Sequence, residues 1–128
     1  LDWYLLEDEE HKKMQDFTRK CMKLGKNYRC LYETDYSGDG FRWINANDKD
    51  NSTYSFVRVS PDGKKHLLFV LNFTPVERDN FRIGVPAKGK YKLVLGNDER
   101  NQKKQLTAVA GDCDGYVGNV YGRVYQVA

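Results

Sequence analysis

The hydrophobic period of the sequence changes near residue 41, and this change constrains the fold more than any other feature. Over residues 8–24 the apolar side chains recur at spacings of three and four, which is typical of one buried face of an α-helix. From residue 41 onward, short runs rich in β-branched and aromatic residues are separated by turn residues. These features predict an α-helix followed by an antiparallel β-sandwich.

The predicted helix carries an apolar stripe on an otherwise charged surface. The apolar stripe consists of Met14, Phe17, Cys21 and Leu24. Acidic residues precede the helix and Lys and Arg gather at its end, as the helix macrodipole favours. Three acid-before-base pairs at i,i+4 support it: Asp8 with Lys12, Glu9 with Lys13 and Asp16 with Lys20. We expect the helix to stop at Gly25, and its stripe to pack on the β-domain or on a body upstream.

Five β-rich runs are the clearest strands, at residues 41–44, 52–59, 66–73, 81–85 and 91–95. Two further strands are expected within 106–109 and 116–127, after a polar loop at 97–105.

The segment from Ser60 to Gly63, with Pro61 and Asp62 between them, predicts a hairpin between the second and third runs. Alternation places one core face on the two arms: Tyr54, Phe56, Leu67, Phe69, Leu71 and Phe73. Leu68 and Val70 are apolar too, which indicates a central strand covered on both sides.

Composition and charge argue against several classes of protein. The net charge of +3 is spread thinly, without the basic stripe that tracks phosphates, so we expect no nucleic-acid partner. We expect no membrane association, because no run of about 18 apolar residues occurs. Three widely spaced cysteines without a CxxC pair favour free thiols in a reducing compartment, which predicts a cytoplasmic protein.

The residue pattern supports no catalytic or metal site. The two histidines, His11 and His66, lie in a charged helix and at a turn-to-strand junction, and neither has a second ligand at metal-binding spacing. No phosphate-binding glycine motif is present, and we expect no cofactor. Six aspartates stand in turn-like surroundings and are interpreted as turn residues: Asp48, Asp50, Asp79, Asp98, Asp112 and Asp114.

Aromatic residues are the one class that suggests binding. Nine Tyr, six Phe and two Trp provide flat apolar rings of the kind on which sugar faces stack, although core packing explains most of them. Trp43 lies in an alternating strand and is expected to be buried, whereas Trp3 and Tyr4 precede the helix without a local core. If any ring contacts a carbohydrate, our candidates are Trp3, Tyr4 and Trp43.

Several segments resemble one known family. They read LDWYLLE at residues 1–7 with His11, FRWIN at 41–45 with Asp48 and Asn51, and NFTPV at 72–76 with FRIGVP at 81–86. These segments are similar to motifs of the 1,4-α-glucan branching enzymes, of glycoside hydrolase family 13, and cover roughly residues 1 to 98. After Asp98 the chain departs from the pattern, and the family's final strand is not matched, which would expose a sheet edge.

The resemblance implies two parts: residues 1–35 as the last helical end of a catalytic (β/α)8 barrel, and residues 36–128 as a Greek-key, all-β C-terminal domain. The parent enzyme would cut α-1,4-glucan and transfer the freed piece to a 6-hydroxyl, making the α-1,6 branches of glycogen. Its nucleophile and acid/base would lie upstream, so the resemblance implies no catalytic residue here. The implied partners are the parent barrel and α-glucan.

Two alternatives stay open. One is the tail of another α-amylase-superfamily enzyme, such as a debranching enzyme, against which the NFTPV and FRIGVP segments argue. The other is a free-standing carbohydrate-binding module, which would have no need of the N-terminal helix.

Overall fold

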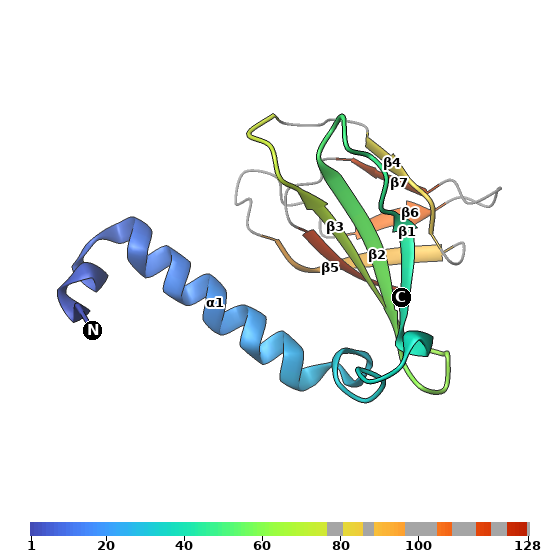
Figure 1. Cartoon of the computed structure of the whole chain (residues 1–128), viewed down its shortest axis with the longest axis horizontal. Coiled ribbons are helices and arrows are strands. Elements are labelled where there is room, and N and C mark those ends of the chain that lie inside the picture. The colour runs from blue at the N-terminus through green and yellow to red at the C-terminus, as the bar shows by residue number, and fades with distance from the viewer. Residues whose placement is uncertain (77–80, 86–88, 97–104, 109–114, 119–122, 128) are drawn as a thin grey trace.

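The computed structural model of the chain describes residues 1–76, 81–85, 89–96, 105–108, 115–118 and 123–127, and places a long helix ahead of two antiparallel sheets (Figure 1). The helical elements are η1 (Trp3–Glu7), α1 (Glu9–Asn27), η2 (Arg29–Leu31) and η3 (Gly38–Gly40). The strands are β1 (Phe41–Asn45), β2 (Thr53–Val59), β3 (His66–Asn72), β4 (Phe81–Ile83), β5 (Gly89–Leu95), β6 (Gln105–Ala108), β7 (Gly115–Gly118) and β8 (Arg123–Val127). The predicted order, a helix and then an antiparallel sheet, is confirmed.

Helix α1 begins where the sequence predicts and ends later. Asp8 is its N-cap, and its side chain accepts hydrogen bonds from the backbone N–H groups of Glu10 and His11. The predicted stop at Gly25 is wrong, because Gly25 does not take the left-handed conformation of a C′ glycine and the helix continues to Asn27. The helix ends at Tyr28, whose backbone N–H donates to the Leu24 carbonyl at 3.2 Å.

The apolar stripe is not buried in this chain, contrary to the expectation that the β-domain could cover it. No residue of α1 is buried, and the Met14 side chain is 66% exposed. Cys21 is exposed, while Phe17 and Leu24 are half-buried. In Figure 1 the helix extends away from the sheet, and only its C-terminal end approaches the strands. The predicted helix is confirmed, but the described residues cover its apolar stripe only at Leu24, which packs against Cys30 and Leu67.

The larger sheet has the order β1-β2-β3-β8-β5-β6, and β4 pairs with β7 in a second sheet. The predicted hairpin is confirmed, since β2 and β3 pair without a register shift from Thr53 opposite Asn72 to Val59 opposite His66. Gly63 has a φ of +71°, which a glycine adopts without strain, and its backbone N–H donates to the Ser60 carbonyl. The turn chemistry of this segment therefore sets the register of β2 and β3.

Strand β3 is covered on both faces, as the sequence predicts. Leu67 and Val70 are 0% exposed and Leu68 is 1% exposed. Leu68 and Val70 pack with Ile83 of β4 and Tyr91 of β5, whereas Leu67 packs on the opposite side with Cys30 from η2. The two sides of the strand thus belong to two separate clusters.

The predicted core face of the hairpin is only half correct. On β2 the buried side chains are the alternate set, Thr53, Ser55, Val57 and Val59, and the aromatic side chains of Tyr54 and Phe56 are half-buried. Phe73 lies beyond the end of β3 and is 67% exposed. Ile83 and Tyr91 supply a cover on the side of Leu68, whereas the aromatic side is covered chiefly at one end, near Leu67. Contacts from β4 and β5, which are distant in sequence, decided which face of the hairpin became the better-buried one.

Predicted strand limits agree with the structure to within a few residues. The run at 116–127 separates into β7 and β8, with residues 119–122 outside the described part. Most of the predicted polar loop, residues 97–104, also lies outside it. Among the described residues, no helix has the length and hydropathy needed to cross a bilayer.

Candidate functional site

Trp43 lies on β1, the first strand of the larger sheet, opposite Phe56 of β2. Its side chain is 57% exposed, so the expectation that Trp43 is buried is wrong. The alternation of β1 indicates a side facing inward, but its burial pattern leaves both Arg42 and Trp43 exposed. Strand β1 lies at the edge of the larger sheet, and this position explains why Trp43 is exposed. The residues of the strand do not themselves encode its place in the sheet.

The rings of Phe41 and Phe56 hold the Trp43 side chain in place, and these three rings together with Phe69 form what we call the aromatic row. The Trp43 ring meets Phe41 edge-on with centroids 5.1 Å apart, and meets Phe56 in the same way at 5.8 Å. Phe56 also stacks on Phe69 of β3, with centroids 4.7 Å apart and an interplanar angle of 9°. Such contacts restrict the rotamers of Trp43, so an exposed indole is held at a fixed orientation, as an aromatic binding platform requires.

The other two candidate rings lie elsewhere. Trp3 and Tyr4 belong to η1 and are 67% and 66% exposed. In Figure 1 the N-terminal turn and β1 lie at opposite ends of the molecule. The structure therefore does not bring Trp3 and Tyr4 together with Trp43 into one site.

The sequence pattern does not indicate a second ring pair, which joins the exposed Phe73 to the half-buried Tyr54. Phe73 meets Tyr54 edge-on with centroids 5.5 Å apart. The Asn72 side chain accepts from the backbone N–H of Thr74 at 3.0 Å and from its hydroxyl at 2.7 Å, which ends β3 and turns Phe73 out of the strand. The Asn-x-Thr pattern was the available signal, because an Asn side chain that bonds the backbone two residues on makes a turn.

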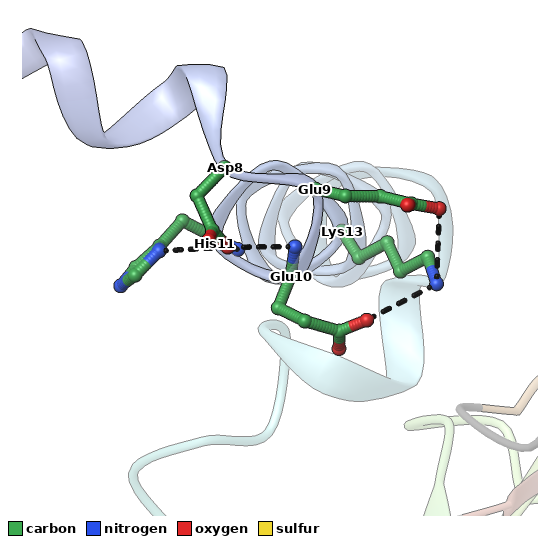
Figure 2. A network of polar contacts seen from close by, with 5 residues as sticks. All are labelled: Asp8, Glu9, Glu10, His11 and Lys13. Carbon is green, nitrogen blue, oxygen red and sulfur yellow. Dashed lines mark hydrogen bonds and ion pairs between the residues drawn. The ribbon is translucent and has the colours of Figure 1, made fainter.

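The acidic cluster at the start of α1 is a helix cap with surface ion pairs (Figure 2). Asp8 Oδ1 lies 3.1 Å from His11 Nδ1, and Lys13 Nζ lies 3.4 Å from Glu9 and 3.3 Å from Glu10. The backbone N–H of His11 is the main cause of a lowered pKa at Asp8, followed by its side chain. All five side chains are exposed, so these pairs contribute little beyond capping. The predicted Glu9–Lys13 pair is confirmed, whereas Asp16 pairs with Arg19 at 3.0 Å.

Asp48 and His66 are two further titratable residues of the described chain. Asp48 accepts from Asn51 Nδ2 at 2.9 Å and from Thr53 Oγ1 at 2.6 Å, which supports its interpretation as a turn residue. Burial, together with Arg42, lowers the pKa of His66. Asp79, Asp98, Asp112 and Asp114 lie outside the described residues. Where the structure describes the chain, no three His, Cys, Asp or Glu side chains gather as metal ligands.

Two of the three cysteines lie in the described part, and both are free thiols. Cys21 is exposed on α1, and Cys30 is buried in η2, where burial raises the pKa of its thiol. Cys113 lies outside the described residues.

Comparison with known proteins identifies the family to which the chain belongs. The sequence profile of the family "Alpha amylase, C-terminal all-beta domain" matches residues 43–124. The 1,4-alpha-glucan branching enzyme GlgB of Butyrivibrio fibrisolvens is 43% identical over 121 residues, which cover 89% of this chain and 19% of that protein. The branching enzyme GlgB 1 of Clostridium perfringens strain SM101 is 40% identical over 99% of this chain and 19% of its own length.

The branching enzyme GlgB of Aquifex aeolicus strain VF5 is 37% identical over 78% of this chain and 16% of that protein. The chain thus spans about a fifth of the length of the curated relatives that it matches. It belongs to the family of alpha-amylase C-terminal all-beta domains and is homologous to the C-terminal part of the branching enzymes.

Proposed function

We propose that this chain is the C-terminal region of a 1,4-α-glucan branching enzyme and acts there as a non-catalytic support domain. The observation that carries the proposal is the match of 89% of the chain, at 43% identity, to 19% of a curated branching enzyme. The whole enzyme would transfer α-1,4-glucan segments to 6-hydroxyls and so make the α-1,6 branches of glycogen, in the cytoplasm. The catalytic carboxylates belong to the remainder of the enzyme, and we assign no catalytic residue to this chain.

Residues 1–35 and 36–128 form two functional parts in this proposal. The first is the closing helical end of the catalytic barrel, and the second is the β-domain. Exposure of the apolar stripe supports the division, since Met14 is 66% exposed and no residue of α1 is buried by the described chain. A helix with one apolar face requires a partner for that face, and the barrel is the partner we propose.

The β-domain is proposed to be a Greek-key sandwich, in which the β4-β7 pair is part of a second layer over the larger sheet. Ile83 of β4 supports this arrangement, because it shares a core cluster with Leu68 and Val70 of β3 and with Tyr91 of β5. Layers that share one core cluster in this way are the basic unit of a sandwich.

Glucan contact at Trp43 is the second function that we propose, and the exposed, ring-supported indole favours it. Trp43 is 57% exposed, and its orientation is fixed by Phe41 and Phe56. Trp3 and Tyr4 are separate, weaker candidates because η1 provides no comparable ring support in the described structure. The same indole would serve a free-standing carbohydrate-binding module, so binding alone does not choose between the two functions.

A titration of the purified chain with maltoheptaose and glycogen tests both the support role and the glucan contact at Trp43. We expect no hydrolysis and no formation of α-1,6 linkages, because a support domain lacks the catalytic pair. Amide shifts recorded by NMR should move at β1 and β2 when maltoheptaose binds, and Trp43→Ala should abolish those shifts. Tyr36→Ala is the matched control, since Tyr36 is 101% exposed and takes no part in the ring contacts of Trp43, which are with Phe41 and Phe56. Turnover by the isolated chain would contradict the support role, and shifts that survive Trp43→Ala would contradict glucan contact at this ring.

A further inference from the structure

The segment between α1 and β1, residues 28–40, is tied to the sheet at several points, and we call it the joint. Cys30 is 3% exposed and packs against Leu67, which is 0% exposed. Leu24 and Tyr28, at the end of α1, pack against the same cluster. The last turn of the helix and the turn end of the β2-β3 hairpin therefore share one small core.

Polar contacts fix the remainder of the joint. Arg58 Nη2, from β2, donates to the Leu31 carbonyl at 3.4 Å and to Asp35 Oδ1 at 3.1 Å. The Thr34 hydroxyl donates to the Val59 carbonyl at 3.3 Å. These bonds join residues 23 to 27 positions apart in sequence, so they constrain the path of the chain rather than a local turn.

Arg58 has a largely buried side chain, whereas Arg42, Lys90 and Lys92 on other described strands are exposed. Its side chain is only 15% exposed, although that of its partner Asp35 is 61% exposed. Its Nε is buried and donates no hydrogen bond to the described residues. Leaving such a donor unpaired is unfavourable. The two bonds that the guanidinium does make, both to the joint, account for its position.

We propose that the joint holds α1 in one fixed direction relative to the sheet, and that Arg58 is its positioning residue. The helix then projects its apolar stripe as a preorganised arm. A rigid arm loses less conformational entropy when it docks than a freely swinging one, and this lowers the cost of association. The identity of the body on which the arm docks rests on the proposed function; the rigidity of the joint does not.

The test measures the distance distribution between two spin labels by pulsed electron paramagnetic resonance. The labels are placed on Lys12→Cys in α1 and Asn47→Cys after β1, both exposed positions. Cys21 and Cys113 are replaced by Ser, and the buried Cys30 is kept. We expect one narrow distribution in this parent and a distribution at least twofold wider in Arg58→Gln, because both bonds to the joint are lost.

Two further variants separate positioning from a general loss of stability. Arg58→Lys keeps a cation that reaches Asp35 and should restore most of the narrow distribution. Asp35→Asn changes only the exposed ion-pair partner of Arg58. It should widen the distance distribution partially without unfolding the sheet. Arg42→Gln, on the neighbouring strand, is the matched control and should leave the width unchanged.

A broad distribution in the parent would overturn the rigid joint. A narrow distribution in Arg58→Gln, Asp35→Asn and the parent alike would overturn the role of Arg58. Neither result depends on branching activity, so the proposed function can fail or hold independently. If Arg58→Gln does not fold, the comparison of Arg58→Lys and Asp35→Asn with the parent still decides the outcome.

Discussion

Gly40 lies so close to Thr34 that a Cβ atom at residue 40 would stand 2.0 Å from Thr34 Oγ1. Gly40 is buried, and the Thr34 hydroxyl is itself held by the Val59 carbonyl. An added methyl group must therefore displace the joint from the end of β2.

We expect Gly40→Ala to lower the free energy of unfolding by about 1–3 kcal/mol, the usual cost of overpacking. Gly38→Ala is the matched control in the same turn, because nothing lies within 4 Å of its added Cβ. Urea denaturation of both variants measures the difference. Equal stability of the two variants would contradict the close packing of Gly40 against Thr34.

The cluster on one face of β3 is expected to dominate the stability of the domain. Leu68 is 1% exposed and packs with Ile83 and Tyr91, so Leu68→Ala leaves a cavity. We expect this substitution to lower the free energy of unfolding by about 2–5 kcal/mol. Val76→Ala is the control, because the Val76 side chain is 54% exposed, and it should lower the free energy of unfolding by much less than Leu68→Ala. Thermal unfolding followed by circular dichroism provides the measurement, and a small effect at Leu68 would show that β4 does not cover this face.

The N-cap of α1 should make helix content depend on pH. The pKa of Asp8 is lowered in the folded chain, chiefly by the backbone N–H of His11, so the charged cap stabilises the helix above the ordinary carboxyl pKa. As the pH falls through the folded value, Asp8 is protonated and this contribution is lost.

We therefore expect the helical signal in circular dichroism to decrease below about pH 4, the ordinary range of a carboxyl group. Asp8→Asn is the control, because Asn still caps a helix but does not titrate. The remaining acidic residues titrate in both proteins, so the difference between the two curves reports Asp8. Identical curves would mean that the charge of Asp8 has no part in the cap.

The apolar stripe should promote association of the isolated chain. Met14 is 66% exposed, and Phe17, Cys21 and Leu24 continue the stripe along α1. Large exposed apolar patches bind hydrophobic dyes and other proteins. Light scattering and dye fluorescence should both decrease in Met14→Lys, while Gln15→Lys adds the same charge off the stripe and should change them little. A strict monomer without dye binding would count against the stripe as a docking face.

Local sequence signals predicted the parts of the fold that local chemistry determines. The turn from Ser60 to Gly63 and the flanking alternation were sufficient for the hairpin, and the acidic start of α1 was sufficient for its N-terminus. Burial could not be predicted in this way. Trp43 is exposed because β1 is the first strand of its sheet, and Tyr54 is less buried than Ser55 because Ile83 and Tyr91 cover the other face.

At the candidate site, too, the sequence predicted residues but not the contacts that form when strands pair. The sequence identified Trp43 as an aromatic candidate but not its contacts with Phe41 and Phe56, which depend on strand pairing. Arg58 gave no sequence signal, because a charged residue in an alternating strand is normally read as solvent-facing. Its contacts with Leu31 and Asp35 arise only when the joint folds back onto β2.

Grafting tests the central claim most directly. In the branching enzyme of Butyrivibrio fibrisolvens, the matching 121-residue segment would be replaced by this chain, with a deletion of that segment as the control. We predict that the graft forms α-1,6 branches in amylose at a rate within tenfold of the intact enzyme, that the deletion is unstable or inactive, and that this chain alone forms none. A well-folded graft without branching activity, or branching by this chain alone, would contradict its role as the support domain of a branching enzyme.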